Sequence, residues 1–410
     1  MVRAMIRLAL CGVWVVMSPA VPELTGSTAD PVTEWSVAAS EAAVATKMSP
    51  FRTPITLAIL HLAMYDAVTA IARDRDAYFV RPSVVSPASA HAAAIEAGYR
   101  VLVAEFPSEQ TAISRRYQTL LASVPDGPAK TNGIAVGSIV AAQLLESRAH
   151  DGRKATRVHT PASGAGVWIP TPPGFGAAST AFLAAVVPFT MSSGAQFRPA
   201  GPPALGSQQW ADEYNEVKKL GGKHGAARTS AQTATALFWE PLAGTVWPAT
   251  IRRLAAERAL DLSASARFQA AAFAAFADGL IACWEAKFHF NFWRPTTAIR
   301  QGESDGNDRT EVDPKWEPLS TTPEFPEYPS GHACATAAVV FTIEAFFPNA
   351  VIPARNIASG EERVYRRAKD VVDEVVEARM LLGVHFRAAD VDGAEMGHRI
   401  AEQIQRRFAK

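Results

Sequence analysis

The sequence predicts an all-α protein made of two helical bundles side by side. Apolar residues recur at helical spacing through most of the chain, and alternating runs typical of strands are sparse. A long stretch rich in Gly and Pro separates two helical halves. With 410 residues, 48% of them hydrophobic and 20% charged, the chain can bury a sizeable core. Its formal net charge of zero gives no indication of a nucleic-acid partner.

The first twenty residues have the pattern of a signal peptide. Arg3 and Arg7 precede a short apolar run over 8–17, and Ser18-Pro19-Ala20 offers small residues for cleavage. We therefore expect residues 1–20 to be removed and the protein to be secreted or periplasmic, with an uncleaved anchor as the alternative. No later stretch is expected to be long and apolar enough to span a membrane.

The helical halves are expected at residues 35–150 and 206–410, joined by a Pro/Gly-rich connection at 151–205. In the first half, helical patterns cover 37–48, 54–73, 89–106, 108–122 and 128–148. In the second they cover 207–220, 230–239, 248–260, 263–294, 331–347, 358–382 and 392–408, with a Pro-rich loop at 314–329. No Gly-rich nucleotide-binding loop is present in the sequence.

Cleavage would leave two cysteines, Cys283 and Cys334. Two cysteines do not make a disulfide framework, so buried free thiols are the favoured interpretation. A single bridge is the alternative in an oxidising compartment.

A first basic pair lies in an aromatic stretch of the second half. Lys287 and Arg294 are seven residues apart, about 700° around a helix, which predicts one helix face two turns apart. Pro295 is expected to end or bend this helix. Taken alone, the pair is better explained as a solvated basic face. The aromatic residues between the two cations favour burial, however, and buried cations need an anionic partner.

A second segment, Tyr328-Pro-Ser-Gly-His332, follows the Pro-rich loop and opens an apolar helix. Ser330 fits an N-cap, and Gly331 would let a ligand approach the free N–H groups of the first turn. His332 would lie in that turn, placed to exchange a proton. The alternative is an ordinary capped helix start.

A third segment carries Arg379 and His385, six residues apart and therefore on different faces of a straight helix. Gly383 can end the helix in a left-handed turn and redirect His385. Arg379 offers a fork of donors suited to an oxyanion. Taken together, the three segments describe a pocket for a tetrahedral or trigonal-bipyramidal oxyanion, with two histidines able to occupy opposite apical sides.

The three blocks resemble the pattern Lys-x6-Arg-Pro, Pro-Ser-Gly-His and Ser-Arg-x5-His-x3-Asp of the vanadium haloperoxidase and PAP2-type acid phosphatase superfamily. The first two blocks match at every defining position. In the third, Ala378 replaces Ser and Ala389 stands where Asp is expected, with Asp390 one place later. That departure puts in doubt a carboxylate partner for His385. The stretches 60–70 and 196–199 also look like bacterial vanadium haloperoxidase-like proteins.

The resemblance implies vanadate as cofactor, with His385 axial to vanadium. It places five residues around the vanadate oxygens: Lys287, Arg294, Ser330, Gly331 and Arg379. His332 would act as acid and base, and Lys287 would polarise bound peroxide. The implied partners are hydrogen peroxide, a halide and an organic acceptor.

Two aromatic residues favour the peroxidase branch. Trp284 lies one turn before Lys287, and Phe325 lies five residues before Ser330. Both resemble residues on the halide side of fungal-type vanadium chloroperoxidases, where an apolar wall suits a weakly hydrated anion. The alternative is that both are core aromatics. Bromide is the expected halide, with chloride as a further candidate.

Two other functions share this pocket. A PAP2-type acid phosphatase would need no cofactor, since His385 would attack the phosphorus of a phosphate monoester and His332 would protonate the leaving group. A non-catalytic binding protein could also have kept the pocket, although a mere oxyanion trap needs neither histidine.

Overall fold

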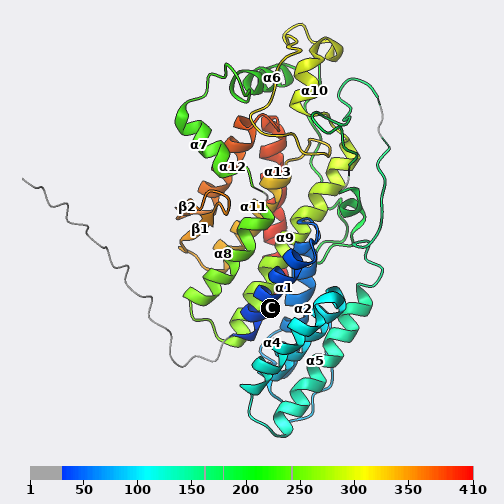
Figure 1. Ribbon diagram of the computed structural model, residues 1–410, viewed down its shortest axis with the longest axis vertical. Helices are drawn as coiled ribbons and strands as arrows, with labels where there is room; N and C mark the ends of the chain where they lie inside the picture. The colour runs from blue at the N-terminus through cyan, green and yellow to red at the C-terminus, as the bar shows by residue number, and fades with distance from the viewer. Residues whose placement is uncertain (1–29, 161–162, 179, 242, 410) are drawn as a thin grey trace, which may run out of the picture.

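The computed structural model describes residues 30–160, 163–178, 180–241 and 243–409, and these are mostly helical (Figure 1). The predicted signal peptide at 1–20 lies outside the described residues. The molecule is elongated, with the N-terminal helices α4 and α5 at its lower end and α6 and α10 at its upper end in Figure 1.

The described N-terminal part contains five helices, and the third of them packs against each of the other four. They are α1 (Pro31–Ala45), α2 (Thr53–Ala72), α3 (Ala90–Glu105), α4 (Gln110–Ala122) and α5 (Pro128–Ser147), with a short 3-10 turn at Pro107–Glu109. The Asp30 carboxylate caps α1 by accepting the N–H groups of Val32 and Thr33. The α2 helix is apolar on nearly every side because it packs against α3, α5 and α9.

The C-terminal part supplies the remaining helices. They are α6 (Gln208–Leu220), α7 (Ser230–Phe238), α8 (Ala243–Glu257), α9 (Leu262–Phe290), α10 (Pro295–Arg300), α11 (Gly331–Phe346), α12 (Ala368–Leu381) and α13 (Arg387–Phe408), with 3-10 turns at Ala181–Ala185 and Gly302–Asp305. The pair α11 and α13 is the most closely packed. A Cβ on Gly397 would lie 2.3 Å from the Cys334 carbonyl oxygen, so a glycine is required for this approach.

The two parts share one apolar core, which runs from α2 through α9 to α11 and α13. The connection at 151–205 has little regular structure. At its start the buried Asp151 forms ion pairs with both Arg148 and Arg153, which hold this end in place. The domain limits 35–150, 151–205 and 206–410 stay a prediction.

Three helix predictions are wrong in detail. The pattern at 263–294 ends as a helix at Phe290, and the helix expected from Pro248 begins at Ala243 and carries Pro248 inside it. The pattern at 358–382 begins instead with a strand. Strand β1 (Ile352–Arg355) pairs antiparallel with β2 (Glu362–Tyr365), and α12 begins only at Ala368. Helical periodicity cannot distinguish a four-residue strand from the end of a neighbouring helix.

Two described helices, α2 and α9, are long and apolar enough to cross a membrane, contrary to the expectation from sequence. Both are enclosed by the rest of the fold, with 83% and 94% of their most apolar windows buried. Burial on all sides explains their continuous hydrophobicity, so they are core helices of this fold.

Candidate functional site

The end of α9 places Lys287 and Arg294 in two different elements rather than on one helix face. Asn291 takes a left-handed conformation with φ 49° and ends the helix, and Arg294 follows in extended backbone just before Pro295 opens α10. The intervening residues pair with the Gly/Pro-rich connection, since Trp168 N–H donates to Asn291 and Trp293 N–H to Gly166. The connection therefore sets the position of Arg294.

The Arg294 guanidinium is completely buried and is held by backbone carbonyls. Its Nε donates to Phe325 O at 2.9 Å and its Nη1 to Val384 O at 2.8 Å. The same Nη1 lies 3.3 Å from His385 Nε2. Its other terminal nitrogen, Nη2, has no partner among the described residues.

Lys287 is also completely buried, and its ammonium group faces the loop before α11. Nζ donates to Pro326 O at 3.1 Å, to Glu327 O at 2.8 Å and to Pro329 O. These carbonyls can occupy all three ammonium hydrogens. Lys287 therefore stabilises the loop, and it would have to exchange a carbonyl for an anion to bind one.

The start of α11 is built as the sequence predicts. Ser330 is the N-cap with extended backbone, Gly331 is the first helical residue and His332 lies in the first turn. Ser330 Oγ makes no capping hydrogen bond and no other well-formed hydrogen bond to a described residue. The first N–H groups of the helix are likewise left without intrahelical acceptors, which makes this end suited to an anion.

The end of α12 brings Arg379 and His385 to the same place. Gly383 has φ 75° and a Cβ there would lie 2.4 Å from Gly221 O, so the expected left-handed turn is confirmed. Arg379 is almost fully buried and donates through Nη1 to Trp239 O at 3.2 Å. Its Nε has no partner among the described residues.

A carboxylate does contact His385, but it comes from the loop before α11. Glu327 Oε1 lies 2.8 Å from His385 Nδ1 and also accepts the N–H of Phe386 at 2.9 Å. Asp390 is buried nearby, and no described residue makes a well-formed hydrogen bond to its oxygens. It faces Ser330 and Arg379, which both favour its charged form.

Burial dominates the electrostatics of the site. It lowers the pKa of Lys287 to about 8 and that of Arg379 to about 10, and it lowers the pKa of Arg294 as well. Burial also raises the pKa of Glu327 and of Asp390, which nearby arginines oppose. Burial thus destabilises the charged forms of the three cations, and a bound anion would stabilise them.

Burial favours the neutral form of both histidines in the same way. Burial, reinforced by the arginine cluster, holds the pKa of His332 and that of His385 well below the ordinary value. His332 Nε2 lies 3.1 Å from Pro241 O, a pure acceptor, so the proton of the neutral ring is on Nε2 and Nδ1 is free to accept.

The donors left without partners test whether an oxyanion fits. At this site Arg294 Nη2 and Arg379 Nε lack partners among the described residues, and Ser330 Oγ makes no well-formed hydrogen bond, with the Asp390 carboxylate beside it. Buried donors are normally satisfied, so this set indicates an absent acceptor with several oxygens. Together with the α11 N-terminus, they match the chemistry of vanadate or phosphate.

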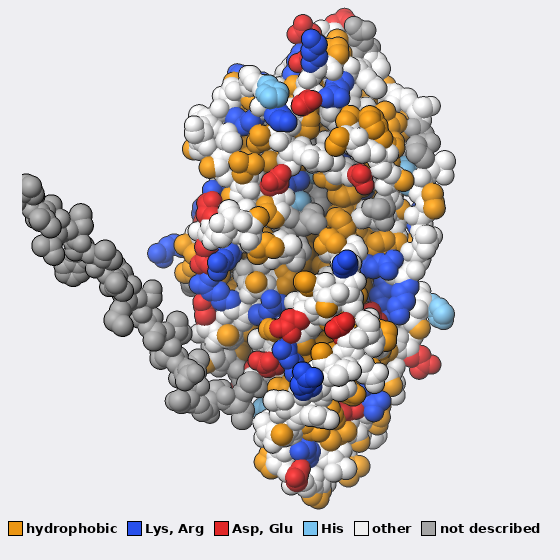
Figure 2. Space-filling model, viewed as in Figure 1, with side chains coloured by type: hydrophobic (Ala, Val, Ile, Leu, Met, Phe, Trp, Pro, Cys, Tyr) orange, Lys and Arg blue, Asp and Glu red, His pale blue; other side chains and the backbone are white. Residues whose placement is uncertain are grey.

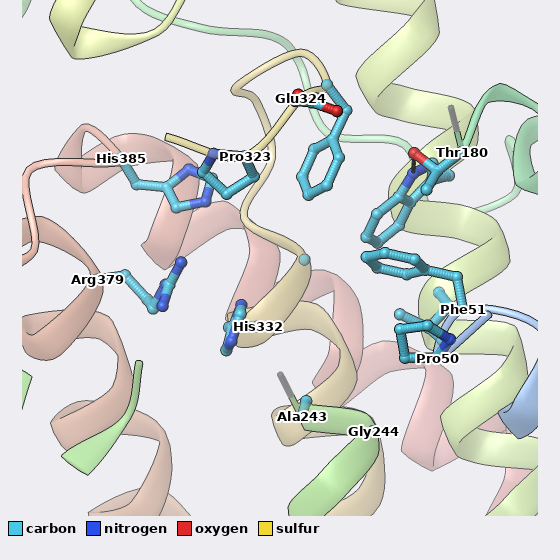
Figure 3. Close-up of a pocket in the computed structure, with 14 residues that line it drawn as sticks. Pro50, Phe51, Thr180, Ala243, Gly244, Pro323, Glu324, His332, Arg379 and His385 are labelled. Atoms are coloured by element: carbon cyan, nitrogen blue, oxygen red, sulfur yellow. Dashed lines mark hydrogen bonds between the residues drawn. The ribbon is translucent and has the colours of Figure 1, made fainter. Parts of the chain in front are cut away.

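A cavity of about 250 Å³ opens next to these donors and is mostly apolar. His332, Arg379 and His385 lie along one side, and Pro50, Phe51 and Thr180 lie opposite (Figure 3). Trp284 and Phe325 line it too, with ring centroids 5.0 Å apart. Figure 2 shows hydrophobic side chains gathered in a hollow near the middle of the molecule.

Comparison with known proteins gives consistent results. Residues 267–410 match the family model for the VCPO second helical-bundle domain. The vanadium chloroperoxidase of Curvularia inaequalis is 31% identical over 185 aligned positions, which cover 36% of this chain and 29% of that protein. The sequence match therefore spans less than a third of that relative's length.

The fold extends the likeness to most of the chain. The crystal structure of a bacterial vanadium-dependent iodoperoxidase superposes with a TM-score of 0.78 at 23% identity, covering 94% of this chain and 98% of that one. A holo-type bacterial vanadium-dependent chloroperoxidase superposes with a TM-score of 0.63 at 16% identity, covering 88% and 94%. The second helical bundle of this chain is thus similar to that of vanadium chloroperoxidases, and the chain as a whole shares the fold of these bacterial enzymes.

The structure gathers the three sequence blocks of this protein around one buried point. The ammonium group of Lys287 is not directed at this point, because it donates to backbone carbonyls. Cys283 and Cys334 are free and buried directly beneath the site, where Cys283 Sγ lies 3.5 Å from Pro329 O.

Sequence reasoning missed several residues of this site. Glu327 carries a signal that could have been found, since it is an acid placed among prolines and aromatics immediately before Tyr328-Pro-Ser-Gly-His. Phe51 and Thr180 carry none, because they come from distant segments that only the tertiary fold brings to the cavity. The carbonyl partners Trp239 and Pro241 are invisible to side-chain patterns.

Proposed function

We propose that this protein is a vanadate-dependent haloperoxidase that oxidises a halide with hydrogen peroxide to hypohalous acid. The observation that carries the proposal is the set of buried, unpartnered donors flanked by two neutral histidines and an aromatic wall. The donors suit an oxyanion, the histidines suit proton transfer and axial ligation, and the wall suits a weakly hydrated halide.

The residues that would hold vanadate are those with free donors. Arg294 Nη2, Arg379 Nε and Ser330 Oγ would bind its oxygens together with the Gly331 N–H, and His385 would bind vanadium through Nε2. Bound vanadate would supply a Lewis acid that activates hydrogen peroxide for attack by halide without changing its own oxidation state. Lys287 would join this set only by releasing one of its carbonyl acceptors.

His332 would move the proton. Its Nε2–H is held by Pro241 O, which leaves Nδ1 as the basic atom. A neutral imidazole in a buried pocket can take a proton from hydrogen peroxide as it binds and return one to the departing oxygen. The low pKa that burial imposes keeps this base available in weakly acidic solution.

The proposed substrates beside hydrogen peroxide are a halide and an organic acceptor. Bromide is the safest expectation and chloride a candidate, and likeness to the iodoperoxidase structure adds iodide. The organic acceptor would react with hypohalous acid at or beyond the cavity mouth. Export to a secreted or periplasmic location is proposed from residues 1–20 alone and is tested by N-terminal sequencing of the mature chain.

The deciding experiment uses protein stripped of anions and then incubated with orthovanadate. Bromination of an activated diketone is measured with hydrogen peroxide and bromide, chloride or iodide, and p-nitrophenyl phosphate hydrolysis is measured on the vanadate-free form. Vanadate-dependent halogenation that disappears in His385→Ala is expected. Phosphate hydrolysis that vanadate inhibits, without halogenation, would instead make the protein an acid phosphatase. Inactivity in both assays would contradict both enzymes and leave a binding role.

A further inference from the structure

Glu327 is a buried acid whose side chain and backbone both contact the site. Its side chain is fully enclosed, with Oε1 against His385 Nδ1 at 2.8 Å and against Phe386 N at 2.9 Å. Its own N–H is fixed by Phe292 O at 2.9 Å. A burial this complete, with a charged-type side chain, requires specific partners.

The shared oxygen determines the tautomer of His385. A backbone N–H can only donate, so Oε1 is an acceptor from Phe386 whatever the protonation state of the carboxyl group, whose other oxygen can carry any proton. His385 Nδ1, facing the same acceptor, must therefore carry a hydrogen. In the neutral ring this leaves the lone pair on Nε2, and Arg294 Nη1, a pure donor, faces Nε2 at 3.3 Å.

Asp390 does not share this task. It follows His385 at nearly the spacing of the third sequence block, but no hydrogen bond links it to His385, and the groups that favour its charged form are Ser330 and Arg379. Since Asp390 lies in the first turn of α13 and Glu327 lies in the loop before α11, the two carboxylates come from different elements.

We propose that Glu327 is the positioning residue of the oxyanion site, fixing His385 as the Nδ1–H tautomer and leaving the lone pair on Nε2, the ring atom that faces Arg294. The backbone of the same residue also holds Lys287, whose Nζ donates to Glu327 O at 2.8 Å. One residue thus places both His385 and the buried lysine. The inference rests on the anion site of the proposed function, but it makes no use of halogenation.

The first test needs no variant. In protein labelled with 15N-histidine, NMR reports which ring nitrogen carries the proton, and the His385 signals are assigned by their loss in His385→Gln. A protonated Nδ1 and a bare Nε2 are expected in the anion-free protein at neutral pH. A proton on Nε2 would overturn the proposal, whatever the enzyme's activity.

The second test compares variants by tautomer and by affinity for orthovanadate, measured calorimetrically. Glu327→Gln should keep the tautomer and most of the affinity, because Phe386 N–H orients the amide oxygen toward Nδ1. Glu327→Ala should mix the tautomers and weaken vanadate binding about 10- to 100-fold, the usual effect of losing the partner that orients a metal-binding histidine. Asp390→Asn is the matched control and should leave the tautomer unchanged.

The outcomes separate the two levels of interpretation. If Glu327→Ala keeps the tautomer and the vanadate affinity, or if Asp390→Asn alone changes the tautomer, Glu327 is not the positioning residue. If the tautomer follows Glu327 while halogenation is absent in the wild-type protein, the proposed function fails and this inference stands. Should Glu327→Ala not fold, the wild-type tautomer and Glu327→Gln still decide the matter.

Discussion

The indole of Trp284 and the ring of Phe325 lie with centroids 5.0 Å apart, and Lys287 Nζ lies 5.6 and 5.2 Å from the same two centroids. Phe51 completes the group, 5.0 Å from Trp284 and 5.9 Å from Phe325. The aromatic wall, defined as Phe51, Trp284 and Phe325, therefore stands over a buried cation. Such a wall excludes water while the cation favours an anion, a combination suited to a large halide.

Truncation of the wall should affect the halide and spare the oxyanion. Phe325→Ala keeps the backbone carbonyl that holds Arg294, so phosphate affinity should stay near that of the wild type. The apparent KM for bromide should rise about 10-fold, as expected when an apolar contact worth about 1.4 kcal/mol is lost. Steady-state kinetics at saturating peroxide measure it.

Phe341→Ala is the matched control, because its ring contacts His398 and lies ten residues along α11 from Gly331, about 15 Å away. It should leave the bromide KM unchanged. Equal effects of the two truncations would show that the wall acts through stability alone.

Arg294 and Arg379 should decide whether an oxyanion stabilises the fold. Phosphate or vanadate at 100 times its Kd should raise the free energy of unfolding by about 2.7 kcal/mol, because it binds only the folded protein. Arg294→Gln or Arg379→Gln should weaken that anion about 10- to 100-fold, since each removes a charge-assisted donor. Thermal unfolding with and without anion measures both effects.

Arg387→Gln provides the control for charge. Arg387 is a half-buried arginine at the start of α13 that pairs with Glu216 and Glu377 instead of facing the cavity. It should keep the anion-dependent rise in melting temperature. Loss of the rise in this variant as well would indicate a general charge effect rather than a specific site.

Gly331 is predicted to be irreplaceable because of one neighbour. A Cβ at this position would lie 2.8 Å from Trp284 Cζ3, and the indole is anchored by a 2.8 Å hydrogen bond from Nε1 to Thr180. Gly331→Ala should therefore displace the start of α11 and lower phosphate affinity. In a Trp284→Leu background the same change should do less, with a coupling of about 1 kcal/mol.

Gly206, in the turn before α6, gives the comparison for this double-mutant cycle, since a Cβ there would meet nothing within 4 Å. Gly206→Ala should leave phosphate affinity unchanged in both backgrounds. Additive effects of Gly331→Ala and Trp284→Leu would show that the indole does not restrict Gly331.

The sequence predicted the site well where its chemistry resides in local motifs. Ser330, Gly331 and His332 lie at the start of α11 as the motif predicts, and Gly383 makes the turn that redirects His385. These outcomes depend on capping and glycine conformation, which act over a few residues. The mostly helical fold was predicted from hydrophobic periodicity, which is also a local pattern.

The sequence failed where tertiary contacts override local pattern. Arg294 was expected on the Lys287 helix, but Asn291 ends α9 and pairing with residues 166–168 of the connection redirects the chain. The sequence left a carboxylate partner for His385 in doubt, because Asp390 is one place away from the expected position, whereas the structure supplies Glu327 from a loop 58 residues earlier. Neither a backbone pairing across the fold nor an acid from a distant loop is visible in one segment's spacing.

The last prediction concerns pH and a histidine outside the site. His61 is fully buried in α2, stacks on Phe273 at 4.4 Å, and has no hydrogen-bond partner on either ring nitrogen among the described residues. Burial, and then Arg252, hold its pKa well below the ordinary value of 6.5. As pH falls below about 6.5 the unfolded chain takes up a proton that the folded protein cannot, so stability is lost toward acid.

The expected slope for His61 is about 1.4 kcal/mol per pH unit between pH 6.5 and its lower folded pKa. His332 and His385, whose pKa values are also lowered, add to the slope of the wild-type protein. His61→Leu should therefore reduce the slope by about one proton's share without abolishing it. His91→Gln, at an exposed position of α3, should not, because that ring meets solvent in both states. Urea unfolding between pH 4.5 and 7.5 measures the slopes, and identical slopes in wild type and His61→Leu would show that His61 is protonated equally in both states.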